Sequence, residues 1–245
     1  MRINFRSSIV YFILLVMVSF FRLGLAKNKD FRLITEDGQQ FKPELLDFGS
    51  DGLKGLTEEQ KRKLLSGEVV VLSSPEVIGK DKTLITAVLE FNCPINKVWS
   101  VLSMPERQNE YLKEIEKINI LEQKADINRL EFVVNLLGSH LRYVVIHHFQ
   151  PEKYFLWWEL DRSVHNDLKE LFGFWKLYSA GDKTVGRYGS SVRPDFALPG
   201  FLRSMVLRSN IKLTLEKVRN FIESGENKKK INRQNCQKIN KIVVR

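Results

Sequence analysis

Residues 201–224 read FLRSMVLRSNIKLTLEKVRNFIES, a long segment without an internal proline or glycine. Apolar residues recur in it at intervals of three and four and form one stripe, made of Leu207, Ile211, Leu215, Val218 and Ile222. This periodicity predicts an amphipathic helix of about 35 Å, at about 1.5 Å per residue, which is long enough to cross a whole sheet. Gly225 is expected to end the helix.

The chain before this helix predicts a run of strands. Residues 83–92 are rich in β-forming side chains, and six similar segments follow at 117–124, 129–137, 141–150, 154–161, 167–179 and 184–193. The segments are separated by turn-forming dipeptides, namely Ala125-Asp126, Gly138-Ser139, Pro151-Glu152 and Gly181-Asp182. Short strands joined by hairpins favour an antiparallel sheet over βαβ units.

Two short helices are expected after the first of these strands. Ile95–Leu102 places its apolar residues on one helical face, and Pro105 separates it from a second helical piece at Gln108–Ile115. The predicted fold class is therefore α+β. A strongly curved antiparallel sheet cannot fill its own concave side, so we expect the long helix to cover that side and to enclose a cavity.

The segment before residue 82 is expected to form an N-terminal extension, covering residues 27–81. Residues 27–56 are mixed and glycine-rich, which predicts a loosely ordered lead-in. Thr57 and Gln60 form a capping box that begins a short helix, and Gly67 ends it. Residues 68–72 predict one more strand, and the main domain then covers residues 82–225.

This order of elements, with three motifs, resembles the START-like superfamily, also called SRPBCC. The motifs are CPINKVWSVL at Cys93–Leu102, GFWKL at Gly173–Leu177 and LPGFL at Leu198–Leu202. Family members show a small-Pro-x-x-x-Val-Trp/Phe pattern after the first strand, a Gly-x-Trp strand, and a similar approach to the last helix. The resemblance covers about residues 68–225.

The superfamily includes polyketide cyclases, coenzyme-Q-binding proteins and pollen-allergen-type carriers. The resemblance therefore implies a helix-grip fold, in which a curved antiparallel sheet wraps around a long C-terminal helix. It also implies binding, and transport, of a hydrophobic small molecule or lipid in an internal cavity. The alternative function is an enzyme of the cyclase/aromatase or hydrolase type that uses the same cavity.

Large aromatic side chains are the main candidates for the cavity wall, because ligand pockets are lined mostly by apolar and aromatic groups. Trp157 with Tyr143 and Phe132 is the preferred set, and Trp175 is next. The full set of candidates adds Phe172 and, at the start of the last helix, Phe201 and Met205. An ordinary close-packed aromatic core is the competing interpretation.

Two polar residues join these candidates. His147 and His148 are neighbours on one strand, so they point to opposite faces and cannot bind one metal ion together. If the face with His147 lines the cavity, its ring could orient a ligand carbonyl or hydroxyl; a structural histidine is the commoner role. Glu159 shares its face with Trp157, and with Asp161 it could act as a general acid, although a solvated strand end is the commoner setting.

The motifs give no catalytic, metal-binding or cofactor-binding residue. Nucleophile elbows, phosphate-binding glycine loops and zinc-ligand spacings are missing from the sequence. Neither a metal nor a cofactor is therefore expected.

Cys93 and Cys236 could pair in an oxidising compartment, but two unpaired thiols are favoured because nothing in the sequence specifies their geometry.

The net charge of +10 comes from the two ends of the chain, and acids and bases nearly balance in residues 27–225. A basic face for nucleic acid is therefore not supported.

A signal peptide is predicted over residues 1–26 from Arg2 and Arg6, the apolar run at 9–21 and Gly24-Leu25-Ala26. This predicts export to the periplasm or outside the cell; an uncleaved membrane anchor is the alternative. The basic tail, 226–245, is expected to be disordered, and contact with anionic lipid headgroups is its alternative role.

Overall fold

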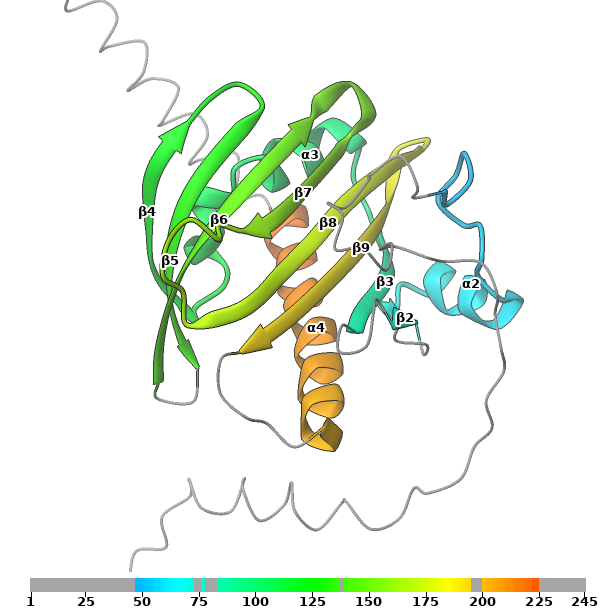
Figure 1. Cartoon of the computed structure of the whole chain (residues 1–245). Coiled ribbons are helices and arrows are strands. Elements are labelled where there is room, and N and C mark those ends of the chain that lie inside the picture. Colours follow the sequence, from blue (N-terminus) through cyan, green and yellow to red (C-terminus); the bar gives the residue numbers. More distant parts are fainter. Residues whose placement is uncertain (1–46, 73–75, 78–82, 137–138, 195–199, 225–245) are drawn as a thin grey trace, which may run out of the picture. The chain divides into compact units, whose positions relative to one another are not determined.

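An antiparallel sheet wrapped around one long helix forms the body of the protein (Figure 1). The computed structural model describes residues 47–72, 76–77, 83–136, 139–194 and 200–224. The strands are β1 (Val70–Val71), β2 (Glu76–Val77), β3 (Thr83–Phe91), β4 (Ile115–Gln123), β5 (Ile127–Leu136), β6 (Ser139–Gln150), β7 (Phe155–Leu160), β8 (Leu168–Ala180) and β9 (Lys183–Pro194). The helices are α2 (Glu58–Leu65), α3 (Ile95–Leu102), η3 (Pro105–Glu110), η4 (Pro151–Lys153) and α4 (Gly200–Glu223).

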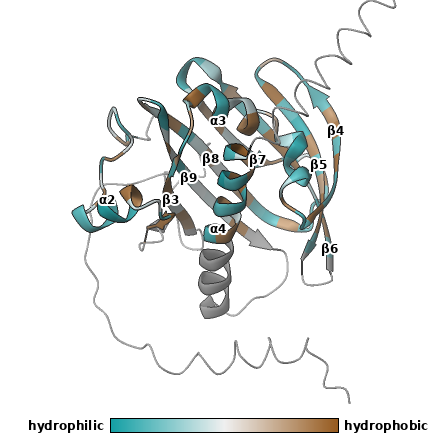
Figure 2. Cartoon of the chain, turned by 180° about the vertical axis from the view of Figure 1, so that it is seen from behind, coloured by the Kyte–Doolittle hydropathy of each residue, from teal (hydrophilic) through white to brown (hydrophobic). Residues whose placement is uncertain are grey.

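The strands follow one another in the order β1-β3-β9-β8-β7-β6-β5-β4, and β2 also pairs with β3. Every pairing is antiparallel, and from β4 to β9 each strand pairs with the next one in the chain. The exception is β3, which pairs with the last strand, β9. The sheet curls so that one face, here called the concave face, covers α4 (Figures 1 and 2). The expected α+β class is confirmed.

The main hydrophobic core lies between the concave face and the helices α3 and α4. Leu215, Val218 and Ile222 of the predicted apolar stripe are buried there, and Ile211 packs against the same cluster. The opposite side of α4 carries hydrophilic residues (Figure 2). The side chain of Leu207 and the expected stop at Gly225 lie outside the described residues. None of the described helices is long and apolar enough to cross a membrane.

The prediction of a helix at Gln108–Ile115 is wrong. A short 3-10 helix begins three residues earlier, at Pro105, and Ile115 is already the first residue of β4. The physical reason is the proline, because its fixed φ suits the first position of a helix and it has no N–H to satisfy there. The helix α2 has the predicted capping box between Thr57 and Gln60.

The loop at residues 47–56 is part of the fold, so the expectation of a loosely ordered lead-in is wrong there. Its anchor is Arg187, whose buried guanidinium donates to the carbonyl oxygens of Gly52 and Lys54 at 2.5 and 2.7 Å. The same guanidinium lies 4.7 Å from the ring centre of Phe48, which stacks on Phe174 at 5.9 Å. Only the tertiary structure joins these groups, because they are far apart in sequence.

Three predictions concern residues outside the described part of the chain: the signal peptide at 1–26, the remaining lead-in at 27–46 and the basic tail at 226–245. The tail includes Cys236, whereas Cys93 is a buried free thiol.

Candidate ligand-binding cavity

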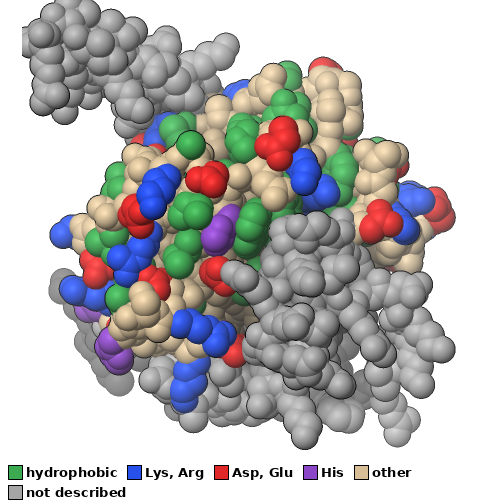
Figure 3. Space-filling model, turned by 45° about the horizontal axis from the view of Figure 1, so that its top comes forward, with side chains coloured by type: hydrophobic (Ala, Val, Ile, Leu, Met, Phe, Trp, Pro, Cys, Tyr) green, Lys and Arg blue, Asp and Glu red, His purple; other side chains and the backbone are tan. Residues whose placement is uncertain are grey.

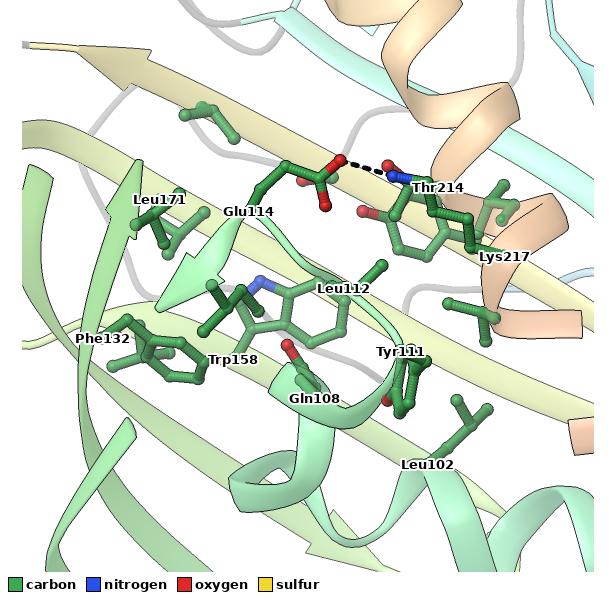
Figure 4. A pocket seen from close by; sticks show the side chains of 18 of the residues that line it. Leu102, Gln108, Tyr111, Leu112, Glu114, Phe132, Trp158, Leu171, Thr214 and Lys217 are labelled. Atoms are coloured by element: carbon green, nitrogen blue, oxygen red, sulfur yellow. Dashed lines mark hydrogen bonds and ion pairs between the residues drawn. The ribbon is translucent and has the colours of Figure 1, made fainter. Parts of the chain in front are cut away.

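A cavity of about 530 Å³ lies between the concave face of the sheet, α4 and the segment around η3. Strands β5 to β9 provide its floor, and η3 with the residues that follow it provides one wall (Figure 4). The residues that line it include Gln108, Tyr111, Glu114, Phe132, Tyr143, Val145, His147, Leu156, Trp158, Leu171, Trp175, Tyr188, Ser190 and Lys217.

The alternation of side chains along each strand decides which residues reach the cavity. On β6 these are Tyr143, Val145 and His147, at every second position. The same spacing selects Leu156 and Trp158 on β7. Trp158 lies near the middle of the floor (Figure 4).

Four of the predicted site residues line the cavity, namely Phe132, Tyr143, His147 and Trp175. The rings of Phe132 and Tyr143 stack with centroids 5.7 Å apart and an angle of 10°. His147 lies 6.1 Å from the ring of Phe132. The structure therefore brings these residues together on the concave face.

Trp157, Glu159 and Phe172 do not line the cavity, and their predicted position is corrected. Because Leu156 and Trp158 point inward, Trp157 and Glu159 point to the other face of β7. Phe172 takes the outer face of β8 in the same way, next to the inward-facing Leu171. The side chains of Phe201 and Met205 lie outside the described residues.

On the outer face of the sheet, Trp157 and His148 form their own contact. Their rings stack at 4.7 Å with an angle of 7°, and Nε2 of His148 lies 3.3 Å from Oε1 of Glu159. Acidic, basic and hydrophobic side chains are interspersed on this side of the molecule (Figure 3). These residues are therefore built into the surface of the sheet and have no contact with the cavity.

The sequence reasoning missed Trp158, Tyr188 and Ser190. Trp158 lies 6.1 Å from the ring of His147 and 6.0 Å from that of Tyr188, which in turn lies 4.9 Å from Trp175. One available signal was Gly173, because a glycine opposite an aromatic residue in a neighbouring strand leaves room for the ring.

The solved structures with a similar chain path establish the fold. A STAR-related lipid transfer protein from Xanthomonas axonopodis has a TM-score of 0.52 and 12% identity, over 64% of this chain and 99% of that one. The Zhui aromatase/cyclase from Streptomyces sp. R1128 has a TM-score of 0.51 and 14% identity, over 58% and 94% of the two chains. A START superfamily protein from Mycobacterium smegmatis has a TM-score of 0.50 and 14% identity, over 57% and 97%. The chain has the START-like fold.

The similarity is one of structure, and the sequence identities are too low to assign a function. No protein-family model matches the sequence, and no curated protein matches it. The helix-grip arrangement implied by the sequence motifs is confirmed, with the sheet wrapped around the C-terminal helix.

The interior of the START-like cavity is electrically neutral. Burial lowers the pKa of His147 to about 3, so its imidazole is uncharged near neutral pH. Burial also raises the pKa of Tyr143 and of Tyr188, so both phenols keep their protons. The Tyr188 hydroxyl shares a hydrogen bond with Ser190. The polar groups inside can therefore donate or accept hydrogen bonds without carrying a charge.

Charged groups of the START-like cavity lie at its rim. Lys217 of α4 donates to Glu114, which precedes β4, so the ion pair connects the helix to the segment after η3 (Figure 4). This hydrogen bond from Lys217 lowers the pKa of Glu114. Both side chains are about half exposed. Across the described residues, no group of three His, Cys, Asp or Glu side chains could hold a metal ion.

Proposed function

We propose that this protein binds an apolar small molecule or lipid inside the START-like cavity and carries it. The observation that supports the proposal is a cavity of about 530 Å³ lined mainly by aromatic and aliphatic side chains. Ligand pockets take volumes of about 300–1,000 Å³ and have this kind of lining. Protein interiors are otherwise close-packed, so an open volume of this size beside Trp158 and Tyr143 favours a ligand over a filled core.

The chemistry of the cavity favours binding over catalysis. A general base works best when its pKa is near the working pH, and His147 has a pKa of about 3. Glu159, the other candidate for proton transfer, points away from the cavity. The name of one structural relative, a lipid transfer protein, agrees with a carrier, and that of another, an aromatase/cyclase, with an enzyme.

Native mass spectrometry of the purified chain tests this proposal, followed by extraction and identification of what it carries. We expect a stoichiometric apolar adduct. The chain offers a matched pair of variants, because Trp157 and Trp158 are neighbours on opposite faces of β7. Trp158→Ala should lose the adduct, and Trp157→Ala should keep it.

Three results would count against a carrier. One is a clean mass with no binding from a panel of lipids and quinones. Another is equal loss of the adduct in both tryptophan variants, which would place the ligand elsewhere. The third is turnover of a bound compound, which would assign the cavity to an enzyme.

We also propose that the protein is exported, on the pattern of residues 1–26 alone. Cleavage after Ala26 is the expected event. The mass of the protein recovered outside the cytoplasm measures it, and recovery of the full-length chain in the membrane fraction would instead indicate an uncleaved anchor.

A further inference from the structure

One row of residues crosses the concave face of the sheet and includes the polar side chains of Asn128, His147 and Ser190. Each member pairs in register with the next: Asn128 with His147, His147 with Trp158, Trp158 with Gly173, and Gly173 with Ser190. The adjacent row on one side is wholly apolar and consists of Leu130, Val145 and Leu160. The row on the other side begins with Phe149, Leu156 and Trp175 and ends with Tyr188. We call Asn128, His147, Trp158, Gly173 and Ser190 the polar row.

One end of the polar row has hydrogen-bonding capacity that the protein does not use. His147 and Asn128 are only 3% and 4% exposed. Among the described residues, Nδ1 of His147 and Oδ1 of Asn128 have no hydrogen-bond partner. A buried polar group without a partner costs about 1–3 kcal/mol, so such groups in native proteins call for an explanation. Of the two residues, His147 is the one that lines the cavity.

The other end of the polar row carries one neutral hydroxyl, that of Ser190, beside the hydroxyl of Tyr188 from the adjacent row. Ser190 is 7% exposed and shares a hydrogen bond with the Tyr188 hydroxyl. Trp158 lies between the two ends, 6.1 Å from the ring of His147 and 6.0 Å from that of Tyr188. The floor of the cavity is thus an indole flanked by an imidazole and by hydroxyls.

Charge is absent from the polar row. Its members are neutral, and the charged lining residues Lys217 and Glu114 are paired with each other at the rim. A carboxylate or phosphate carried to the row would lose its hydration without meeting a cation, which is very unfavourable. A hydroxyl or carbonyl group carries no such cost and matches the donors and acceptors of neutral imidazole and serine.

We propose that the polar row binds a hydroxyl or carbonyl group of an uncharged ligand whose ring system lies against Trp158, and that it rejects carboxylates and phosphates. This inference rests on the proposed function, because it assigns the chemical class of the ligand in the same cavity. His147 and Ser190 set the preference, and the aromatic side chains hold the apolar body of the ligand.

Three anthracene derivatives of nearly equal size test the proposal. They are 9-anthracenemethanol, 9-methylanthracene and anthracene-9-carboxylate, titrated into the purified chain at pH 7 and followed by tryptophan fluorescence. One neutral hydrogen bond corresponds to about a 2–10-fold change in Kd. The alcohol should therefore bind about 5-fold more tightly than the methyl compound, and the carboxylate more weakly than both.

The variant His147→Phe keeps a ring of similar size and removes both nitrogens. It should remove the preference for the alcohol over 9-methylanthracene, measured as the ratio of the two Kd values. His148→Phe is the matched control, because it is the next residue on β6 and its side chain lies on the outer face. Ser190→Ala gives a second variant should His147→Phe fail to fold, and it should also reduce the preference.

The outcomes separate this inference from the proposed function. Equal affinity for the alcohol and the methyl compound, or tightest binding of the carboxylate, would contradict the binding role of the polar row. Neither result would contradict the proposed carrier function. Binding of fatty acyl lipids with no binding of any of the three ring compounds would overturn the assigned ligand class. Failure of the ring compounds and of every lipid tested would remove the proposed function together with the inference.

Discussion

The indole of Trp158 lies directly over Gly173, its partner in the neighbouring strand. A Cβ atom at residue 173 would lie 2.2 Å from Cζ2 of Trp158 and 2.7 Å from the carbonyl oxygen of Gly189. Non-bonded atoms do not approach one another this closely, so the absence of a side chain at residue 173 is what leaves room for the ring in the cavity floor. The glycine of the GFWKL motif therefore shapes the cavity.

Gly173→Ala should displace the ring of Trp158 and so lower the affinity for the ligand, with a smaller effect on the stability of the fold. Overpacking of this kind costs about 1–3 kcal/mol of stability. The control is Gly189→Ala, whose added Cβ would lie 2.2 Å from Phe174, which points away from the cavity. Urea denaturation and ligand titration of both variants measure the effect. Comparable losses of stability, with binding lost only in Gly173→Ala, are expected; equal binding by the two would contradict the assigned role of Gly173.

Arg187 should be essential for attaching the loop at residues 47–56. Its two hydrogen bonds to backbone carbonyls are charge-assisted, and each such bond contributes about 1.5–3 kcal/mol. Arg187→Met should therefore lower the free energy of unfolding by about 2–4 kcal/mol and expose the loop to proteases. The conservative Arg187→Lys should restore little, because an ammonium cannot make both bonds of the planar fork. Protection of the loop from limited proteolysis in Arg187→Met would contradict this assignment.

Acid should destabilise the protein through His147. Its pKa is about 3 in the folded state against an ordinary value of 6.5, so between these values only the unfolded chain binds the proton. Stability from this residue is complete above about pH 6.5 and falls as the pH drops, by about 1.4 kcal/mol per pH unit. Urea denaturation of the wild type and of His147→Phe at several pH values measures the difference. The free energy of unfolding of the variant should fall less steeply on acidification than that of the wild type. Parallel curves for the two proteins would contradict this prediction.

The Glu114–Lys217 ion pair should affect ligand exchange more than stability. Exposed pairs contribute about 0–1 kcal/mol, and salt screens them. Because this pair bridges α4 and the segment after η3 at the cavity rim, Glu114→Gln should speed ligand release, and added salt should do the same to the wild type. Stopped-flow measurement of release tests this. The control is Glu58→Gln, which removes a similar surface pair with Lys61 on α2 and should leave release unchanged.

The order and length of the elements could be predicted from the sequence because both depend on local chemistry. The helix α3 begins and ends at the predicted residues, and the strands from β3 to β9 lie within a few residues of their predicted ends. Turn dipeptides, a capping box and the period of the apolar residues are all properties of neighbouring residues. Two departures are η3, where a proline began a helix instead of only separating two, and β2, a two-residue strand that was not predicted.

The inward face of each strand could not be predicted in the same way. Alternation shows that Trp157 and Trp158 lie on opposite faces of β7, but it does not show which of the two faces the cavity. The choice depends on Gly173 across the strand pair and on α4 beyond the cavity, which are distant in sequence. Leu171 and Phe172 on β8 present the same problem, because Phe172 was predicted to line the cavity and Leu171 is the residue that does.

Local propensity and periodicity were enough to predict the α+β class, the succession of hairpins and the long closing helix. Only the tertiary structure shows that Trp158 and not Trp157 faces the cavity, and that Arg187 holds the loop at residues 47–56. It also aligned Asn128, His147, Trp158 and Ser190 in one row. The physical reason is that register between strands and contact across the sheet depend on residues far apart in the chain, which no local pattern encodes.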